Sequence, residues 1–268
     1  MKVIVFGSGL PTTAETAQGV RDHGHEVVVV PAPTGGDNLT ETDMADRLTG
    51  CSVVIDLSGP PSLADGTLTE DDGLVIDEDA LVARRGRATA GLLAAEAAVG
   101  VEHHVSLSVV GVDRVRAEGV FRALRAQEEM IRRSGIPYSI VRATQLFESA
   151  VEIAAATTED WIVWVPPVAI RPVAGAEMAT LLAHTAAFKP TNAVQEIAGP
   201  DQFRLDAFVR AALTAEEEHR RVFADNRSTV FGARIRHADL LPGPWAHVAR
   251  QRYGDWLADR SASEAVKP

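Results

Sequence analysis

The sequence of 268 residues contains a single cysteine, Cys51. One thiol cannot form an internal disulfide, and it cannot supply a thiolate cluster to a metal, so both kinds of stabilisation are excluded. This scarcity of cysteine is typical of a reducing compartment, and we therefore expect a cytoplasmic protein.

Long apolar runs are also lacking. No run approaches the ~20 residues that a helix needs to cross a bilayer. The apolar run at residues 3–6 stops at Gly7, which predicts a first strand instead of a signal peptide. We expect no membrane association.

Basic charge is scarce: 26 Lys and Arg stand against 37 Asp and Glu, a formal net charge of -11. Nucleic-acid binding depends on clustered basic charge, so we expect no nucleic-acid partner. The sequence also lacks a His-Glu-x-x-His motif, a phosphate-binding lysine loop and a Gly-x-Ser-x-Gly elbow, which disfavours metallohydrolase, kinase and serine hydrolase activities. Adjacent residues of a strand point to opposite faces, so His103 and His104 cannot share an ion, and we expect no metal site.

What the sequence does contain is a regular alternation of apolar runs and amphipathic stretches. Leu81, Ala88, Leu92 and Ala95 recur at helical spacing between two such runs. Fully apolar strands separated by helices indicate a parallel sheet covered on both faces. We therefore predict an α/β, Rossmann-type doubly wound fold. The expected strands are residues 3–6, 27–30, 53–55, 101–107 and 138–141.

The alternation of apolar runs and amphipathic stretches becomes less regular after residue 148. We expect a Rossmann-like nucleotide-binding core at 1–148, followed at 149–268 by a region that forms a small substrate-binding cap and completes the core. The tail at 260–268 has no apolar anchors, and we expect it to fray. Short strands are expected at 161–165 and 168–170, and helices at 174–187 and 205–215.

Several segments, in order along the chain, carry a family resemblance. They are SLSVVGVDR at 106–114, RALRAQEE at 122–129, PYSIVRATQ at 137–145, RPVA at 171–174, AGP at 198–200 and GDWL at 254–257. Together they resemble the NmrA-like group of atypical short-chain dehydrogenases. The resemblance implies a core that binds NAD(P), a small cap, and an activity ranging from reductase or isomerase to a redox sensor without chemistry.

The first turn departs from the Gly-x-x-Gly-x-x-Gly of that family. Gly7 keeps the first glycine, but Leu10 and Thr13 stand where the other two belong. Gly9 is a displaced substitute, and the hydroxyls of Thr12 and Thr13 could meet a phosphate. The alternative is a turn that only connects strand to helix.

The next cofactor determinant is weak as well. No basic residue follows the second strand to bind the 2′-phosphate of NADP. Asp37 lies several residues beyond the position from which an acidic side chain binds the ribose hydroxyls. If a nicotinamide cofactor binds, NAD is therefore favoured over NADP, and a chain without any cofactor is the alternative. The resemblance places Ser58 and Gly59 beside the ribose and adenine.

Catalytic residues of the family are replaced too. The Tyr-x-x-x-Lys pair, in which lysine tunes the phenol for proton transfer, falls on Val120 and Leu124. Arg122 lies beside them and could orient an anionic or carbonyl group, although an exposed helical arginine is the commoner explanation.

Three other residues are catalytic candidates. Ser108 matches the active-site serine of the family, with a strand-end hydroxyl as the alternative. Asp56 ends a buried strand, so it is either hydrogen-bonded structure or an acid with a raised pKa. Glu148 is the candidate general acid or base, and a solvated helix start is the alternative.

Thr144 and Gln145 follow the fifth strand and are expected near the substrate. Trp161 and Trp164 are expected on opposite faces of one strand, with one lining the cleft and the other packed in the core. Helices beside the sheet are compatible with a homodimer.

Two classes of function remain open. One is an enzyme of specialised metabolism that acts on a small organic substrate, either by hydride transfer or by redox-neutral isomerisation, dehydration or cyclisation. The other is a non-catalytic sensor of a nucleotide or ligand.

Overall fold

The computed structural model describes residues 1–7, 11–32, 41–59, 67–69, 73–116 and 118–265. Its centre is a seven-stranded sheet in the order β14-β11-β7-β6-β3-β1-β2, in which every neighbouring pair is parallel. The predicted doubly wound α/β fold is confirmed. The strands are β1 (Lys2–Gly7), β2 (Glu26–Pro31), β3 (Val53–Asp56), β6 (His103–Val109), β7 (Tyr138–Ala143), β11 (Ala193–Ala198) and β14 (His247–Val248).

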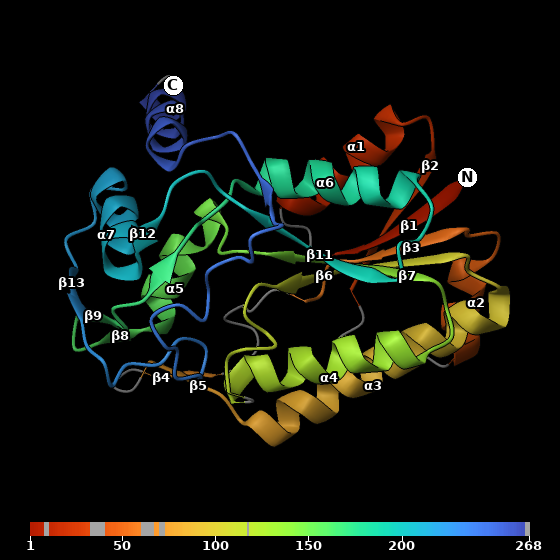
Figure 1. Cartoon of the computed structure of the whole chain (residues 1–268), viewed down its shortest axis with the longest axis horizontal. Coiled ribbons are helices and arrows are strands. Elements are labelled where there is room, and N and C mark those ends of the chain that lie inside the picture. Colours follow the sequence, from red (N-terminus) through yellow and green to blue (C-terminus); the bar gives the residue numbers. More distant parts are fainter. Residues whose placement is uncertain (8–10, 33–40, 60–66, 70–72, 117, 266–268) are drawn as a thin grey trace.

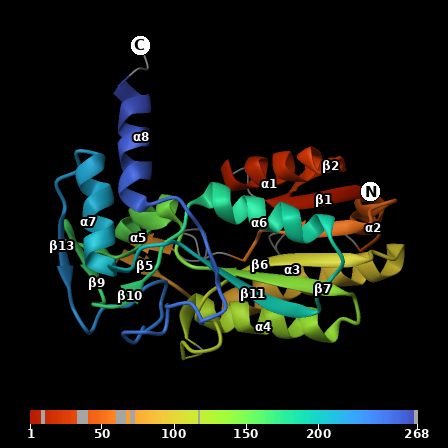
Figure 2. The same cartoon turned by 45° about the horizontal axis from the view of Figure 1, so that its top comes forward.

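Helices cover both faces of this sheet (Figure 1). One face carries α1 (Pro11–Asp22) and α6 (Gly175–Ala187), which lie side by side in both views (Figure 2). The other face carries α2 (Glu41–Leu48), α3 (Glu78–Val99) and α4 (Gly119–Arg133).

The alternation of side chains along β1 shows why both faces are covered. Val3 and Val5 pack with residues of α1 and α6, whereas Ile4 and Phe6 pack with residues of α2 and α3. All four side chains are fully buried. A strand that is apolar at every position is stable only between two layers, as the sequence pattern indicated.

The ends of α3 follow from local sequence. The Asp77 carboxylate accepts a hydrogen bond from the backbone N–H of Ala80, which caps the first turn. Gly100 ends the helix in the left-handed region, at φ 76°, where glycine has no Cβ penalty.

The C-terminal half adds strands to the central sheet and also forms a group of elements outside it. β11 and β14 join the edge of the central sheet, next to β7. Other elements lie beyond the carboxyl ends of the parallel strands, where ligands bind in open α/β sheets (Figure 1). These elements are η2 (Phe147–Ser149), α5 (Ala150–Ala156), β8 (Thr158–Glu159), β9 (Ile162–Val165), β10 (Ala169–Ile170), β12 (Phe203–Arg204), α7 (Leu205–Ala215), β13 (Arg221–Ala224) and α8 (Tyr253–Ala265).

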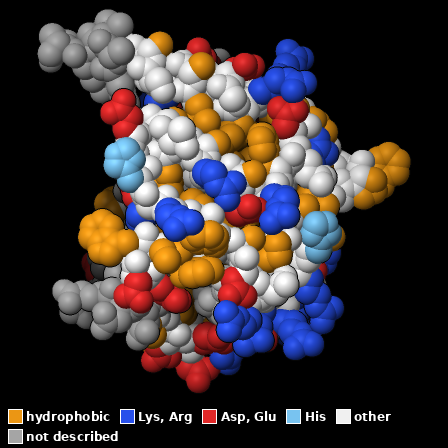
Figure 3. Space-filling view, turned by 90° about the vertical axis from the view of Figure 1, so that its left-hand side faces the viewer, with side chains coloured by type: hydrophobic (Ala, Val, Ile, Leu, Met, Phe, Trp, Pro, Cys, Tyr) orange, Lys and Arg blue, Asp and Glu red, His pale blue; other side chains and the backbone are white. Residues whose placement is uncertain are grey.

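Seen from this end, the surface carries apolar side chains interspersed with basic and acidic groups (Figure 3). Two small sheets lie here, β13-β9-β8 and β10-β12, and a further hairpin pairs β4 (Thr67–Thr69) with β5 (Gly73–Val75). Within the described residues, no helix has both the length and the apolar character required to cross a membrane.

The expectation that the tail frays is wrong for residues 260–265, which are helical in α8. Arg260 pairs with Glu216 of α7 at 2.8 Å and lies over the ring of Trp256. Electrostatic and aromatic contacts thus hold a segment that has few apolar anchors. Residues 266–268 lie outside the described part of the chain.

Candidate functional site

Ser108, near the carboxyl end of β6, belongs to a buried network of charges. Its hydroxyl donates a 2.7 Å hydrogen bond to Oε1 of Glu128 on α4. Arg142 of β7 donates to both carboxylate oxygens of Glu128, at 2.9 and 2.8 Å, and to Asp113 at 2.7 Å. The three central side chains are nearly inaccessible to solvent. The Ser108 hydroxyl is therefore engaged inside the protein.

The protonation state of Glu128 follows from these partners. Burial alone would raise its pKa, but the hydrogen bonds and positive charge of Arg142 hold the pKa below its ordinary value. Glu128 is thus a carboxylate that only accepts hydrogen bonds, and Ser108 must donate to it. This arrangement corresponds to the structural alternative for Ser108.

Both carboxylate oxygens of Asp56, the last residue of β3, accept hydrogen bonds. One carboxylate oxygen accepts from the backbone N–H of Ser58 at 2.9 Å, and the other accepts from Gln127 at 3.0 Å. Arg85 of α3 donates to the backbone carbonyl of Ser58 at 2.6 Å. Asp56 therefore fixes the loop after β3, as hydrogen-bonded structure does.

The same loop passes very close to β6. A Cβ added to Gly59 would come within 1.8 Å of the Leu107 carbonyl oxygen, a distance that no side chain can tolerate. Glycine at this position allows the backbone after β3 to lie directly on the end of β6.

Arg122 lies away from these groups, on the exposed side of α4. Its guanidinium donates to Asp79 at 2.7 Å and lies 3.8 Å from Glu78, both on α3. It is an ion-pair partner between two helices, the commoner explanation for an arginine in this position.

Glu148 lies in η2, after the end of β7. Its carboxylate accepts from the backbone N–H of Gly175 at 3.1 and 3.2 Å, and so caps the start of α6. The residue as a whole is exposed, but its carboxyl group lies among packed side chains. This burial raises the pKa of Glu148, and the nearby negative charge of Glu15 adds to the rise.

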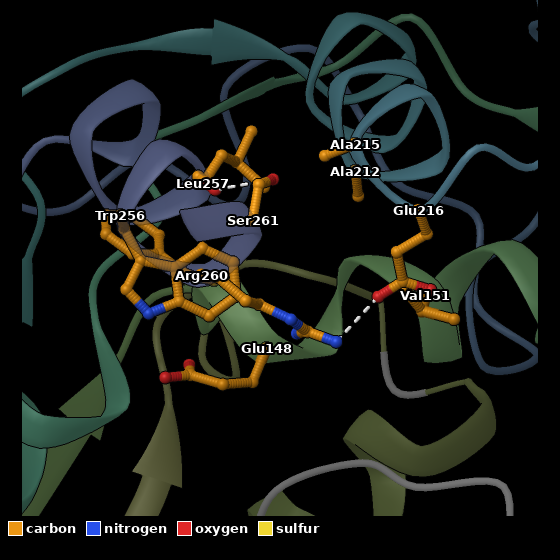
Figure 4. Close-up of a pocket in the computed structure, with 10 residues that line it drawn as sticks. Glu148, Val151, Ala212, Ala215, Glu216, Trp256, Leu257, Arg260 and Ser261 are labelled. Atoms are coloured by element: carbon orange, nitrogen blue, oxygen red, sulfur yellow. Dashed lines mark hydrogen bonds and ion pairs between the residues drawn. The ribbon is translucent and has the colours of Figure 1, made fainter. Parts of the chain in front are cut away.

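The same carboxylate borders a hollow between η2, α5, α7 and α8 (Figure 4). In the close-up, Arg260 reaches across the hollow from α8 toward Glu216, and Glu148 lies below it. A titratable group with a raised pKa beside a hollow is a candidate for giving or taking a proton. The hollow is lined by Phe147, Glu148, Val151, Ala212, Ala215, Glu216, Trp256, Leu257, Arg260 and Ser261.

At the end of β1, Thr13 compensates for a missing glycine. A Cβ on Gly7 would lie 2.4 Å from the Thr13 hydroxyl, so the bare Gly7 makes room for the larger Thr13 side chain. Thr12 packs beside Gly175, whose added Cβ would lie 2.7 Å from the Thr12 methyl group. The Gly9 and Leu10 predictions fall outside the described residues.

Thr144 and Gln145 follow β7 as predicted. The Thr144 hydroxyl donates to the backbone carbonyl of Arg171 at 2.6 Å, which connects two loops. The side-chain oxygen of Gln145 is buried without a hydrogen-bond partner in the described structure. A buried carbonyl oxygen of this kind is costly unless a donor reaches it.

The expected placement of the two tryptophans is wrong. Trp161 lies in the turn between β8 and β9 at φ 65° and is 83% exposed, because the chain reverses there instead of continuing as a strand. Trp164 lies in β9 and stacks on Phe223, with ring centroids 5.4 Å apart. Neither residue lines the hollow.

His103 and His104 point to different partners, as the strand geometry predicts. His104 meets the buried Glu96 at 2.8 Å, and His103 meets Ser139 at 2.9 Å. Among the residues that the structure describes, no group of three or more His, Cys, Asp or Glu side chains could hold a metal ion.

Sequence reasoning missed the far wall of the hollow, which Glu216, Trp256 and Arg260 form. The segment containing Trp256 carries part of the family resemblance, and Arg260 lies in the tail that was expected to fray. An Arg four residues after a Trp on one helix face was the available signal.

Comparison of the sequence with family models and with curated proteins finds no match. The fold, in contrast, matches solved structures over almost the whole chain. MoeE5 in complex with UDP-glucose and NAD aligns with a TM-score of 0.69 and 14% identity, covering 100% of both chains. The dTDP-glucose 4,6-dehydratase DesIV of Streptomyces venezuelae, with NAD bound, aligns at 0.69 and 12% identity, covering 98% of this chain and 97% of the other.

A third match is the NADPH-dependent quinone oxidoreductase QOR2 of Escherichia coli, at TM-score 0.59 and 16% identity, covering 85% of this chain and 79% of that one. The chain has the fold of short-chain dehydrogenase-type enzymes. Identities this low establish the fold and leave the reaction to be argued from the site.

In this fold, the positions of the catalytic Tyr and Lys that the resemblance assigns to Val120 and Leu124 are part of the core. Both side chains are buried, at 0% and 1% exposure. Neither side chain can donate or accept a proton. Buried apolar side chains thus occupy both positions.

The matched structures of MoeE5 and DesIV hold NAD, and that of QOR2 holds NADPH. Gly7 and Thr12 lie at the end of β1 and the start of α1, where a pyrophosphate binds in such folds. The unpartnered oxygen of Gln145 lies just after β7, and an amide NH2 or a hydroxyl would satisfy it.

Proposed function

We propose that this protein is an NmrA-like enzyme that transfers a proton to or from a small organic metabolite, with Glu148 as the general acid or base. The reaction class is redox-neutral: isomerisation, dehydration or cyclisation. The observation that supports this role is that Glu148, alone among the four predicted catalytic residues, lines the hollow.

The chemistry of Glu148 supports this role. A carboxyl group with a raised pKa holds its proton closer to neutral pH and can both release and recover it. The Gly175 N–H stabilises the ionised form at the start of α6, so the group is not forced into the neutral state. Burial thus favours the protonated form of Glu148, and the Gly175 N–H favours its ionised form.

A dinucleotide would be held by Gly7, Thr12, Thr13, Ser58 and Gly59, and Gln145 would contact the substrate. When bound, such a cofactor accepts or donates hydride. We favour NAD over NADP because no basic residue follows β2 in the sequence. The proton transfer by Glu148 does not depend on it.

The proposal is tested by incubating the protein with a small-molecule extract of its source organism and following substrate loss by mass spectrometry. A redox-neutral reaction gives a product of unchanged mass or of mass reduced by one water. Glu148→Gln should abolish the change, and Glu159→Gln, which removes a remote exposed carboxylate, should retain it. A product that differs by two hydrogens would contradict the proposal.

A further inference from the structure

The central sheet ends at β2, where sheets of this class usually continue. In the standard doubly wound order, the third strand lies outside the second. In this protein the next strand of the central sheet, β3, instead pairs with β1 on its far side from β2. Among the described residues, no strand pairs with the outer edge of β2 (Figure 2). The described sheet therefore has an open edge there.

The direction of the backbone groups of β2 follows from its bonds to β1. The backbone N–H of Glu26 donates to the Met1 carbonyl at 3.1 Å, and the two strands are parallel. Backbone groups alternate in direction along a strand, so the N–H and C=O groups of Val27 and Val29 point away from β1. Pro31, the next outward position, has no N–H and ends the row of donors, as prolines of edge strands do.

The side chains of this edge are apolar and partly exposed on both faces of the sheet. Val28 is 38% exposed and Val29 is 44% exposed. Val27 packs on the α1 and α6 side of the sheet and Val30 on the α2 and α3 side, so Val28 and Val29 lie on opposite faces. Edge strands that resist pairing usually carry charged side chains, and these four valines carry none. The edge is thus suited to pair with another strand.

A second copy of β2 matches this edge in backbone and in charge. When the copy runs antiparallel, about a two-fold axis at Val28, Val27 of each chain lies opposite Val29 of the other. Both residues of such a pair point outward, so each pair exchanges two N–H···O bonds. Val28 then lies opposite Val28 of the second copy, which is a favourable pair of β-branched side chains. Glu26 lies opposite Val30, so the two negative charges are kept apart.

We propose that the outer edge of β2 binds the same edge of a second copy of this chain, antiparallel and about a two-fold axis at Val28. The contact joins two seven-stranded sheets into one continuous sheet. A strand of six residues buries less surface than a standard interface, so the dimer dissociates on dilution. None of these residues lines the hollow beside Glu148, and the inference is independent of the proposed function.

The test is sedimentation velocity of the full chain between about 1 and 100 μM. The expected result is a shift from monomer to dimer as the concentration rises. Val28→Lys places two like charges across the two-fold axis and should weaken association about tenfold or more. Val248→Lys is the matched control, because Val248 is 48% exposed in β14 at the opposite edge of the sheet, and it should leave the dimer unchanged.

Mixing two variants tests the position of the axis. Val28→Asp alone should also weaken association, since two carboxylates then face each other. An equal mixture of Val28→Lys and Val28→Asp should form a mixed dimer more tightly than either variant dimerises alone, because opposite charges meet. A mixture that stays monomeric would contradict the pairing of Val28 with its own copy.

Amide hydrogen exchange, followed by NMR, tests the backbone pairing. The Val27 and Val29 amides should become protected as the protein concentration rises, whereas the Val28 amide, which faces β1, should not change. A wild type that is monomeric at every concentration would overturn the proposal and leave this edge to a strand of another protein. A dimer that both Val28 variants leave intact would also overturn it. Thermal unfolding confirms that each variant is folded.

Discussion

The Ser108 hydroxyl donates a 2.7 Å hydrogen bond to the buried Glu128 carboxylate. This contact uses the hydroxyl that the family resemblance assigns to an active-site serine. Arg142 completes the network from the neighbouring strand. The carboxyl edge of the sheet thus contains an internal ion pair.

Ser108→Ala should therefore change stability and leave the reaction intact. Loss of a hydrogen bond to a charged acceptor is expected to lower the free energy of unfolding by about 1.5–3 kcal/mol. Turnover at saturating substrate should stay close to that of the wild type. Urea unfolding and steady-state kinetics measure the two effects, and a large loss of turnover in a fully folded variant would restore Ser108 as a catalytic residue.

Stability should pass through a maximum near pH 6.5, the ordinary pKa of histidine. Burial alone would lower the pKa of His104, but the Glu96 carboxylate raises it above that value. The stability that this pair contributes is fully present below pH 6.5 and is lost as pH rises through the folded pKa. Burial also lowers the pKa of His103, to about 4, so stability falls as pH drops from 6.5 toward that value.

Urea unfolding across this pH range measures both slopes. Glu96→Gln should flatten the alkaline side, because the charge that raises the pKa of His104 is removed, and it should leave the acidic side in place. An alkaline slope that is unchanged in Glu96→Gln would show that another group is responsible.

Two glycines offer a matched pair of substitutions. Gly59→Ala would place a Cβ 1.8 Å from the Leu107 carbonyl oxygen, so the loop after β3 must move off β6. Gly86→Ala, within α3, meets no atom within 4 Å and should stabilise the helix by about 0.5–1 kcal/mol. Thermal unfolding should thus shift in opposite directions, and a tolerated Gly59→Ala would contradict the described path of the loop.

The turn between β8 and β9 carries backbone strain. Asp160 and Trp161 both have positive φ, at 47° and 65°, and the bulky Trp161 is 83% exposed. Trp161→Gly should raise the free energy of unfolding by about 1 kcal/mol, since glycine adopts this conformation without a Cβ penalty. Denaturant unfolding measures the change, and destabilisation would indicate that the Trp161 ring has a packing partner.

The central sheet could be predicted because its strands are apolar at every position and its helices have a clear period. The helix at 205–215 was predicted with the bounds that α7 has. In contrast, β11 was missed because two adjacent polar residues, Gln195 and Glu196, interrupt its apolar sequence, and both are only half-buried.

The candidate site was predicted less completely, because its polar partners are distant in the sequence. The pattern placed Ser108 and Asp56 at strand ends but could not pair them with Glu128 and Gln127 of α4. It also could not place Arg260 over Trp256 and beside Glu216, since that contact depends on how α7 and α8 pack. Glu148 was predicted from its place after a central strand, at the edge of the sheet where ligands bind in such folds, and its role stays a prediction.

The most direct test of the role of Glu148 uses the substrate identified by the extract assay. Turnover of this substrate is measured in D2O, and the product is examined by mass spectrometry. In an isomerisation, the wild type should place one solvent deuterium in the product, and in each reaction class Glu148→Gln should react about 10²–10⁴ times more slowly. Glu159→Gln should behave as the wild type. An unchanged rate in a folded Glu148→Gln variant would contradict the claim that this carboxyl group carries the proton.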